Sequence, residues 1–239
     1  MSSEKLTKYE EGQVLLFDKP LYWTSFDLVG KVRNMLRNKL GLRKIKVGHA
    51  GTLDPLASGL MIICTGKATK RIDEFRDMDK EYIATFTAGA TTPSFDLETE
   101  TDATYPFEHI TEKMLRAKLE SFLGEQKQLP PMYSAKLIEG KRAYEYARKG
   151  IHRELEPVTV YFRELELLSF SLPEIKIRMV CSKGTYVRSF ARDLGVSLQS
   201  GCYLSGLVRS AIGRYRLEGA LDIIKFDEEL EHYKANIGS

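Results

Sequence analysis

Apolar and polar residues follow two different periods along the chain, which predicts a mixture of helices and strands. Apolar residues at every third or fourth position predict amphipathic helices over residues 25–40, 111–123 and 185–198. Short apolar or alternating runs predict strands over residues 12–17, 60–64, 82–87, 159–170, 175–181, 201–210 and 213–217. Because the two kinds of element do not alternate regularly, we expect an α+β fold with a central mixed, mostly antiparallel sheet flanked by helices.

Two of these helices have clear start signals. Thr24 or Ser25 can cap the first, and Gly41 is placed to end it. Thr111 can cap the second. The apolar positions predicted to face inward are Phe26, Val29, Val32, Leu36 and Leu40 in the first helix and Met114, Leu115, Leu119, Phe122 and Leu123 in the second. A short helix at residues 67–75 and a loop at residues 91–104 complete the predicted elements.

Residues 46–59 read Lys-Val-Gly-His-Ala-Gly-Thr-Leu-Asp-Pro-Leu-Ala-Ser-Gly and fit neither period. The three glycines allow backbone conformations closed to other residues, and Pro55 favours an extended backbone at Asp54. We therefore expect a firm loop, anchored to the buried strand at 60–64, that holds one carboxylate in a defined direction. An Asp-Pro pair alone would more often be a simple turn.

Composition limits the class of protein. With 239 residues, 43% hydrophobic and 29% charged, the chain fits one large or two small globular domains. No apolar run approaches the roughly 20 residues of a membrane helix, and the N-terminus does not resemble a secretory signal. Three cysteines and four scattered histidines form neither a disulfide framework nor a metal-ligand spacing. We expect a cytoplasmic protein with reduced cysteines and no metal site.

The distribution of charge says more than the net charge of +3. Residues 28–53 contain seven basic residues and no acidic one. A second basic cluster, within residues 136–153, is interleaved with tyrosines such as Tyr144 and Tyr146. Basic groups neutralise phosphates and aromatic faces stack on unpaired bases, so both clusters suit RNA. Two solvated helix faces would explain the charges equally well.

Residues 46–59 resemble the catalytic motif of the TruB family of tRNA pseudouridine synthases. Further stretches resemble the family's other motifs, in family order: Asp18-Lys19-Pro20, Lys80-Glu81-Tyr82, Pro131-Met132-Tyr133-Ser134-Ala135, Tyr144-Glu145-Tyr146-Ala147-Arg148 and Cys181-Ser182-Lys183-Gly184-Thr185-Tyr186-Val187-Arg188. The resemblance runs from about residue 12 to residue 216. Each motif is weak or moderate by itself, but together they are highly specific.

This resemblance implies a pseudouridine synthase fold with a thumb insertion. It places the catalytic domain at residues 1–225, the thumb-like RNA-binding insertion at 130–153, and a short C-terminal tail at 226–239. The PUA domain that follows in many family members is not expected. The implied activity is isomerisation of uridine-55 in the T loop of tRNA, without a cofactor or metal. The implied partner is the tRNA T arm, acted on by a monomer that needs no membrane, no protein partner and no guide RNA.

The resemblance also assigns catalytic roles. Asp54 is the candidate nucleophile, although removal of a proton from the sugar at C2′ is equally open to a carboxylate. Arg188 is implied to pair with this acid and keep it ionised, which a guanidinium suits because it does not lose its proton. Tyr82 is implied to stack on the target base and is a candidate for taking the C5 proton. Judged by its strand alone, Tyr82 would be an ordinary core residue.

The remaining site residues concern RNA binding. His49 is implied to fill the gap left when the uridine is extruded, although a histidine that hydrogen-bonds within its loop is the alternative. Leu207 is implied to pack on the other side of the base, and Lys19 to support the loop or contact phosphate. The thumb-like segment contributes the predicted RNA-binding residues Tyr133, Lys136, Arg142 and Arg148.

Three other functions remain open from the sequence. The protein could be an RNA-refolding module in which the acid is incidental, or a guide-dependent relative of the same family. The thumb-like segment argues against guide dependence, because standalone family members carry it. An aspartate-based hydrolase would need a second carboxylate or a metal cluster beside Asp54, and the motifs supply neither.

Overall fold

A computed structural model describes residues 7–134, 136–138, 140–147, 149, 151 and 155–237. These residues divide into two compact units. The first unit holds the parts of the chain before Glu81 and after Leu207, and the second runs from Glu81 to Leu207. The chain passes between the units at the start of one strand, β4, and again within another, β12.

The strands of the first unit place the Asp54 loop. β1 (Val14–Lys19) pairs antiparallel with β3 (Ala57–Thr65), and β3 also pairs with β2 (Val47–His49). The last part of β12 (Cys202–Ile212) lies beside β3 and pairs with β13 (Tyr215–Arg216). The loop that carries Asp54 therefore connects β2 to β3, two strands that are hydrogen-bonded to each other.

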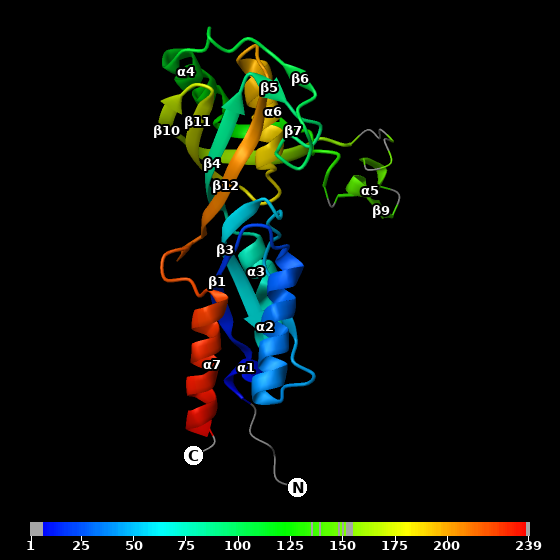
Figure 1. The fold of residues 1–239 in the computed structure, drawn as a ribbon, viewed down its shortest axis with the longest axis vertical. Helices are drawn as coiled ribbons and strands as arrows, with labels where there is room; N and C mark the ends of the chain where they lie inside the picture. The colour runs from blue at the N-terminus through cyan, green and yellow to red at the C-terminus, as the bar shows by residue number, and fades with distance from the viewer. Residues whose placement is uncertain are drawn as a thin grey trace. The chain divides into compact units, whose positions relative to one another are not determined.

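Five helical segments accompany these strands: α1 (Lys8–Gly12), α2 (Ser25–Leu40), the 3₁₀ helix η1 (Gly66–Arg71), α3 (Ile72–Arg76) and α7 (Ile223–Ile237). α2 begins and ends where its sequence predicts. The Thr24 hydroxyl accepts the amide of Asp27, whose carboxylate binds back to Thr24, and Gly41 ends the helix with a φ of 71°. Figure 1 shows α2 and α7 alongside β1 and β3.

The core of the first unit is apolar and extends into α7. Phe17 of β1 packs edge-on against Phe226 of α7, with ring centroids 5.1 Å apart, and Leu230 one turn further on is fully buried. The sequence interpretation places residues 226–239 outside the catalytic domain as a tail. In the structure the described part of this segment belongs to α7 and helps to form the core of the first unit.

The second unit contains the strand order β12-β4-β11-β10-β7. Its strands are β4 (Lys80–Ala88), β7 (Gly124–Gln128), β10 (Val158–Ser171), β11 (Glu174–Cys181) and the first part of β12, with two short hairpins, β5 (Ala90–Thr91) with β6 (Ala103–Thr104) and β8 (Leu137–Ile138) with β9 (Lys141–Arg142). β10 pairs antiparallel with both β11 and β7. The fold is thus α+β with a mixed, mostly antiparallel sheet, as the sequence predicts.

Three helices belong to this unit: α4 (Glu112–Phe122), α5 (Ala143–Ala147) and α6 (Val187–Ser197). Phe190 of α6 lies at the centre of an aromatic core, with its ring 5.1–5.6 Å from those of Phe86, Phe122 and Phe162. These contacts hold α6 against the strands, and so position the first turn of α6.

Several details differ from the sequence predictions. Phe26, predicted to face inward from α2, is 76% exposed, and Met114 and Leu123 are 37% and 43% exposed. Residues 46–59 are not all loop, because β2 takes the beginning and β3 the end. The periodicity also missed α1 and β7, whose sequences are short and polar. Within the described part of the chain, no helix is long and apolar enough to span a membrane.

Candidate active site

Asp54 sits in a loop whose neighbouring backbone groups are held on both sides. The amide of Leu53 donates to the Ser25 hydroxyl at 2.8 Å, and that hydroxyl donates to the Leu53 carbonyl at 3.0 Å. After the acid, the amide of Tyr22 donates to the Pro55 carbonyl at 2.7 Å. The carbonyl of Asp54 itself accepts the amide of Ala57 at 3.0 Å. The loop is thus tied to α2 and to the turn before it, which keeps the half-buried carboxylate in one direction.

Arg209 of β12 fastens the same loop from the other side. Its guanidinium donates to the carbonyls of Leu60 at 2.7 Å, Gly51 at 3.2 Å and Thr52 at 3.4 Å, and the residue is only 1% exposed. Gly59 has a φ of 105°, and a Cβ there would lie 2.4 Å from the Arg209 carbonyl oxygen. A glycine is therefore needed where β3 begins against Arg209.

Sequence reasoning did not select Arg209 as a site residue. It binds backbone carbonyls 149 to 158 positions away, which no local pattern reveals. The signal available in the sequence was an arginine inside an apolar strand, where an unpaired charge would be costly.

Lys19, at the end of β1, is a second buried cation of this unit. It is fully buried, and its ammonium donates to the carbonyls of Trp23 at 2.6 Å and Pro20 at 3.0 Å. Burial lowers the pKa of Lys19 to about 8, although the negative charge of Asp54 opposes this shift. The Arg209 cation lowers it further. The geometry favours support of the loop over a direct contact with phosphate.

His49, the last residue of β2, is half-buried beside the exposed ring of Phe26. The two rings meet edge to face, with centroids 5.8 Å apart. Burial lowers the pKa of His49, a hydrogen bond to the backbone of Gly51 opposes this shift, and the nearby Arg209 cation lowers the pKa further. The imidazole is therefore held in its neutral form, which suits stacking on bases.

In the second unit, Arg188 lies in the first turn of α6 and is 6% exposed. Its Nη1 donates to the carbonyl of Tyr133 at 2.9 Å, and its Nε lies 3.6 Å from a carboxylate oxygen of Asp96. Asp96 is itself 5% exposed. A buried cation thus has a buried anion beside it.

The start of α6 is anchored by reciprocal hydrogen bonds. The amide of Tyr186 donates to the side-chain oxygen of Gln128 at 2.8 Å, and the side-chain nitrogen of Gln128 donates to the Tyr186 carbonyl at 3.1 Å. The Ser189 hydroxyl donates to the Leu129 carbonyl at 2.7 Å. Arg188 lies between these two anchors, so its backbone position is well determined.

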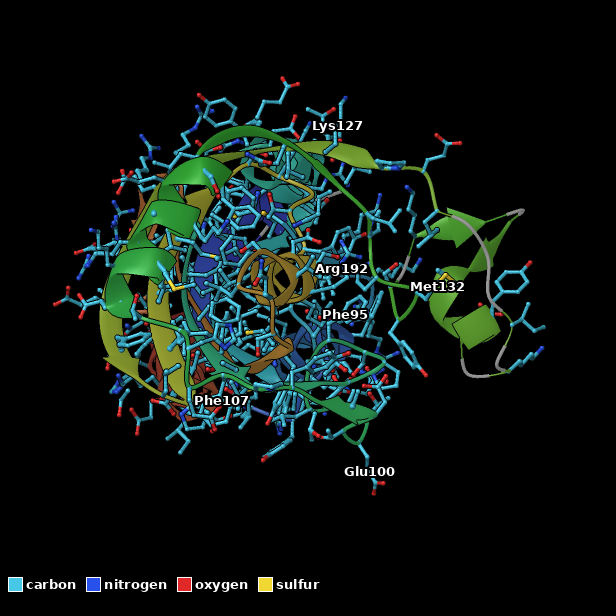
Figure 2. The ribbon with its side chains drawn as sticks, turned by 90° about the horizontal axis from the view of Figure 1, so that it is seen from above. Phe95, Glu100, Phe107, Lys127, Met132 and Arg192 are labelled. Carbon is cyan, nitrogen blue, oxygen red and sulfur yellow. The ribbon has the colours of Figure 1, made fainter. Side chains whose placement is uncertain are left out.

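Asp96 was also missed from the sequence, which predicts only a loop for this segment. Its carboxylate accepts the amide of Glu98 at 2.9 Å, and the preceding Phe95 has a φ of 63°, which is uncommon for an aromatic residue. Arg192, one turn after Arg188, lies 5.2 Å from the Phe95 ring, and Figure 2 shows these two labelled residues side by side. A loop without a periodic pattern thereby supplies the anion next to Arg188.

The other predicted residues are distributed between the units. Tyr82 in β4 is 9% exposed and Leu207 in β12 is half-buried, and both belong to the second unit with Arg188. Asp54, Lys19 and His49 belong to the first unit, where the charge of Asp54 acts on the pKa of Lys19. A pairing of Asp54 with Arg188 stays a prediction.

The thumb-like segment contains the remaining predicted residues. Met132, labelled in Figure 2, marks where the chain leads towards β8, β9 and α5. The ammonium of Lys136 donates to the Glu156 carbonyl at 2.7 Å, and its own carbonyl accepts the amide of Ala143 at 2.8 Å. Arg142 belongs to β9, and Arg148 lies outside the described residues. Tyr144 belongs to α5, and Gly140, just before β9, has a φ of 80°.

Comparison with known proteins identifies relatives of this chain. Residues 34–187 match the family model described as TruB family pseudouridylate synthase, N-terminal domain. The chain is 59% identical to tRNA pseudouridine synthase B of Phocaeicola vulgatus over 223 residues, which cover 93% of this chain and 95% of the relative. It is 52% identical to the protein of the same name from Flavobacterium johnsoniae, covering 94% of this chain and 98% of that one.

A solved structure shares the fold. The crystal structure of a Cbf5-Nop10-Gar1 complex contains a chain that matches with a TM-score of 0.73 and 23% identity. The match covers 95% of this chain and 57% of the other. At this identity the similarity shows a common architecture only.

Proposed function

Because this chain belongs to the TruB family of pseudouridylate synthases, we propose that it isomerises uridine-55 in the T loop of tRNA to pseudouridine. The single observation that supports this most strongly is the anchoring of Asp54. Its loop is held by Ser25, Tyr22 and Arg209 through backbone hydrogen bonds. A carboxylate fixed in this way can meet a reacting sugar without reorganising.

The reaction exchanges one bond of C1′ for another. The C1′–N1 bond breaks, the base turns and a C1′–C5 bond forms, while C5 loses its proton and N1 gains one. As a nucleophile, Asp54 would take the place of N1 on C1′ and later leave when C5 attacks. As a base, it would instead remove the C2′ proton while N1 departs and return that proton to C2′ when C5 bonds to C1′. Both routes need the carboxylate ionised.

We propose that buried cations accompany the acid in the working enzyme. Lys19 and Arg209 are buried cations of the same unit, and the charge of Asp54 acts on the pKa of Lys19. We further propose that Arg188 of the second unit pairs with Asp54 in the working enzyme. Tyr82 would stack on the uracil and receive the C5 proton, and Leu207 would pack on its other side.

RNA binding completes the proposal. The target uridine is stacked within a folded loop and must be extruded before it can react. The neutral imidazole of His49 would stack in the gap, and Tyr133 and Lys136 of the thumb-like segment would contact the RNA.

Tritium release from C5-labelled uridine in a T-arm RNA tests this function. The purified protein, without added protein or guide RNA, should release tritium only from the target position. Asp54→Asn should abolish release while still binding the RNA, since the amide keeps the size of the acid but not its charge. Glu228→Gln, an exposed carboxylate of α7, is the matched control and should release at the wild-type rate.

Two results would contradict the proposal. Wild-type protein that binds the RNA without releasing tritium would indicate an RNA-refolding module. Unchanged release by Asp54→Asn would remove Asp54 from the chemistry. A 2′-deuterated target uridine then separates the two routes, because only removal of the C2′ proton gives a primary isotope effect.

A further inference from the structure

The first unit carries an open groove of about 600 Å³ beside the start of α2. Its walls include three aromatic residues, Tyr22, Trp23 and Phe26, together with Lys31 and Asn34. All of these lie outside the motif that carries Asp54.

Two of these rings are unusually exposed. Tyr22 is 74% and Phe26 is 76% exposed, whereas Tyr105 and Tyr161, the other exposed aromatic residues of the described chain, are 41% and 42% exposed. Isolated exposed apolar side chains are common, but two large rings at one groove are typical of a binding surface.

The turn that presents Tyr22 is rigidly built. Tyr22 has a φ of 67°, a left-handed conformation that is uncommon for a residue with a bulky side chain. The buried ammonium of Lys19 closes this turn by binding the carbonyls of Pro20 and Trp23. The amide of Tyr22 then donates to the carbonyl of Pro55, the residue after Asp54. The backbone of Tyr22 is thereby tied to the loop of the proposed catalytic acid.

Phe26 is linked to the same site by another contact. Its ring meets the imidazole of His49 edge to face at 5.8 Å. One wall of the groove, Phe26, therefore contacts the residue proposed to stack in the gap left by the extruded uridine.

The charge around the groove favours a polyanion. Residues 28–53 contain no acidic side chain, and their exposed basic residues are Lys31, Arg33, Arg37, Arg43, Lys44 and Lys46. One acid, Asp27, does line the groove, but its carboxylate accepts the amide and hydroxyl of Thr24 at 2.8 and 2.7 Å. Asp27 thus completes the capping box of α2 and keeps its negative charge, while Lys31 places a cation at the groove wall.

We propose that this groove stacks an unpaired base of the substrate RNA, a nucleotide next to the target uridine. Aromatic faces bind any base by stacking, and a lysine at the wall suits the adjoining phosphate. The inference rests on the proposed function for the identity of the RNA. It adds a second nucleotide site on the first unit, separate from the residues that handle the uridine.

Binding of a T-arm RNA to an Asp54→Asn parent tests this inference, because the RNA then stays unconverted. Tyr22→Gly removes one ring while suiting the positive φ, and Phe26→Leu keeps an apolar contact but removes the stacking face. Each should weaken the Kd roughly tenfold, within the range known for loss of one base stack. Phe26→Trp should keep the affinity, and Ile224→Ala, 71% exposed on α7, should not change it.

A fluorescent base analogue identifies the nucleotide. 2-Aminopurine placed next to the target uridine should be quenched on binding the parent and remain bright with Tyr22→Gly. Unchanged affinity in both Tyr22→Gly and Phe26→Leu would overturn the inference. Failure of the proposed function would give a different result. The wild-type protein would then release no tritium, although Tyr22→Gly and Phe26→Leu would still weaken RNA binding.

Discussion

The buried cations of the two units have different interaction partners. In the first unit, Lys19 and Arg209 donate to backbone carbonyls, and the charge of Asp54 acts on the pKa of Lys19. In the second, Arg188 lies 3.6 Å from the buried carboxylate of Asp96. Carbonyl partners satisfy hydrogen bonds without cancelling the charge, whereas a carboxylate partner cancels much of it. We infer that the cations of the first unit chiefly hold the backbone around Asp54, and that Asp96 chiefly holds the geometry of Arg188.

The largest effect is expected from Arg188→Met, which breaks the pair in the second unit. Tritium release should fall at least about 100-fold, a typical loss when a transition-state charge partner is removed. Stability should fall by about 3 kcal/mol, because Asp96 is left buried and unpaired. Denaturant unfolding and single-turnover kinetics measure the two losses.

Adding Asp96→Asn to Arg188→Met separates stability from catalysis. The double variant should recover much of the lost stability and none of the activity. Recovery of both would mean that Arg188 serves only the fold of the second unit.

Arg209→Met tests the anchoring of the first unit. Three loop carbonyls lose their donor, so the free energy of unfolding should fall by about 2–3 kcal/mol. The maximal rate should fall roughly tenfold, because a misplaced acid reacts poorly. RNA affinity should change little. Arg216→Met, an exposed arginine on β13, is the control, and an equal loss of rate there would refute a specific role for Arg209.

A smaller effect is expected at the start of α2, where the adjacent residues Thr24 and Ser25 have different roles. Thr24 caps the helix, whereas the Ser25 hydroxyl binds the amide and carbonyl of Leu53. Alanine at either position should cost about 1 kcal/mol of stability. Only Ser25→Ala should slow the reaction, by a few-fold. Equal rates in the two variants would show that this anchor does not position Asp54.

The smallest effect concerns pH and Lys19. Because the pKa of Lys19 is about 8, its charge is lost as pH rises through 8, and activity should decline there. Lys19→Arg stays charged and should move this decline to higher pH, a difference of about two- to threefold near pH 9. A pH–rate profile with the same alkaline limb in both proteins would contradict this role.

Unfolding does not explain such a decline. The pKa of Lys19 lies below its usual value of 10.5, so the unfolded chain binds more protons between pH 8 and 10.5. This group therefore adds stability as pH rises through that window. Thermal unfolding at pH 7 and 9 checks that the folded state persists.

The sequence predicted local features well. The helix at α2, its cap and its end, and the strands β1 and β3 follow from periodicity and backbone chemistry, whereas β2 lies within the stretch predicted as loop. Phe26 was wrongly assigned to the inward face, because its helical spacing matches the core positions although the ring is 76% exposed. Such a residue follows the helical period of the core positions but lies on the surface of the protein.

The missed residues are those whose partners lie far away in sequence. Arg209 donates to carbonyls some 150 positions earlier. Asp96 lies beside Arg188 only in the folded protein, because the two residues are far apart in the sequence. Periodicity reports which face is buried, not which buried charge meets which carbonyl. The supporting network of the acid therefore became visible only in three dimensions.

Mapping pseudouridine at single-nucleotide resolution in cellular RNA tests the central claim most directly. Cells lacking the native gene would carry wild-type protein, Asp54→Asn or Glu228→Gln. We predict pseudouridine at position 55 of tRNA with wild type and Glu228→Gln, and unmodified uridine with Asp54→Asn. Full modification at that position in the Asp54→Asn cells would contradict the account.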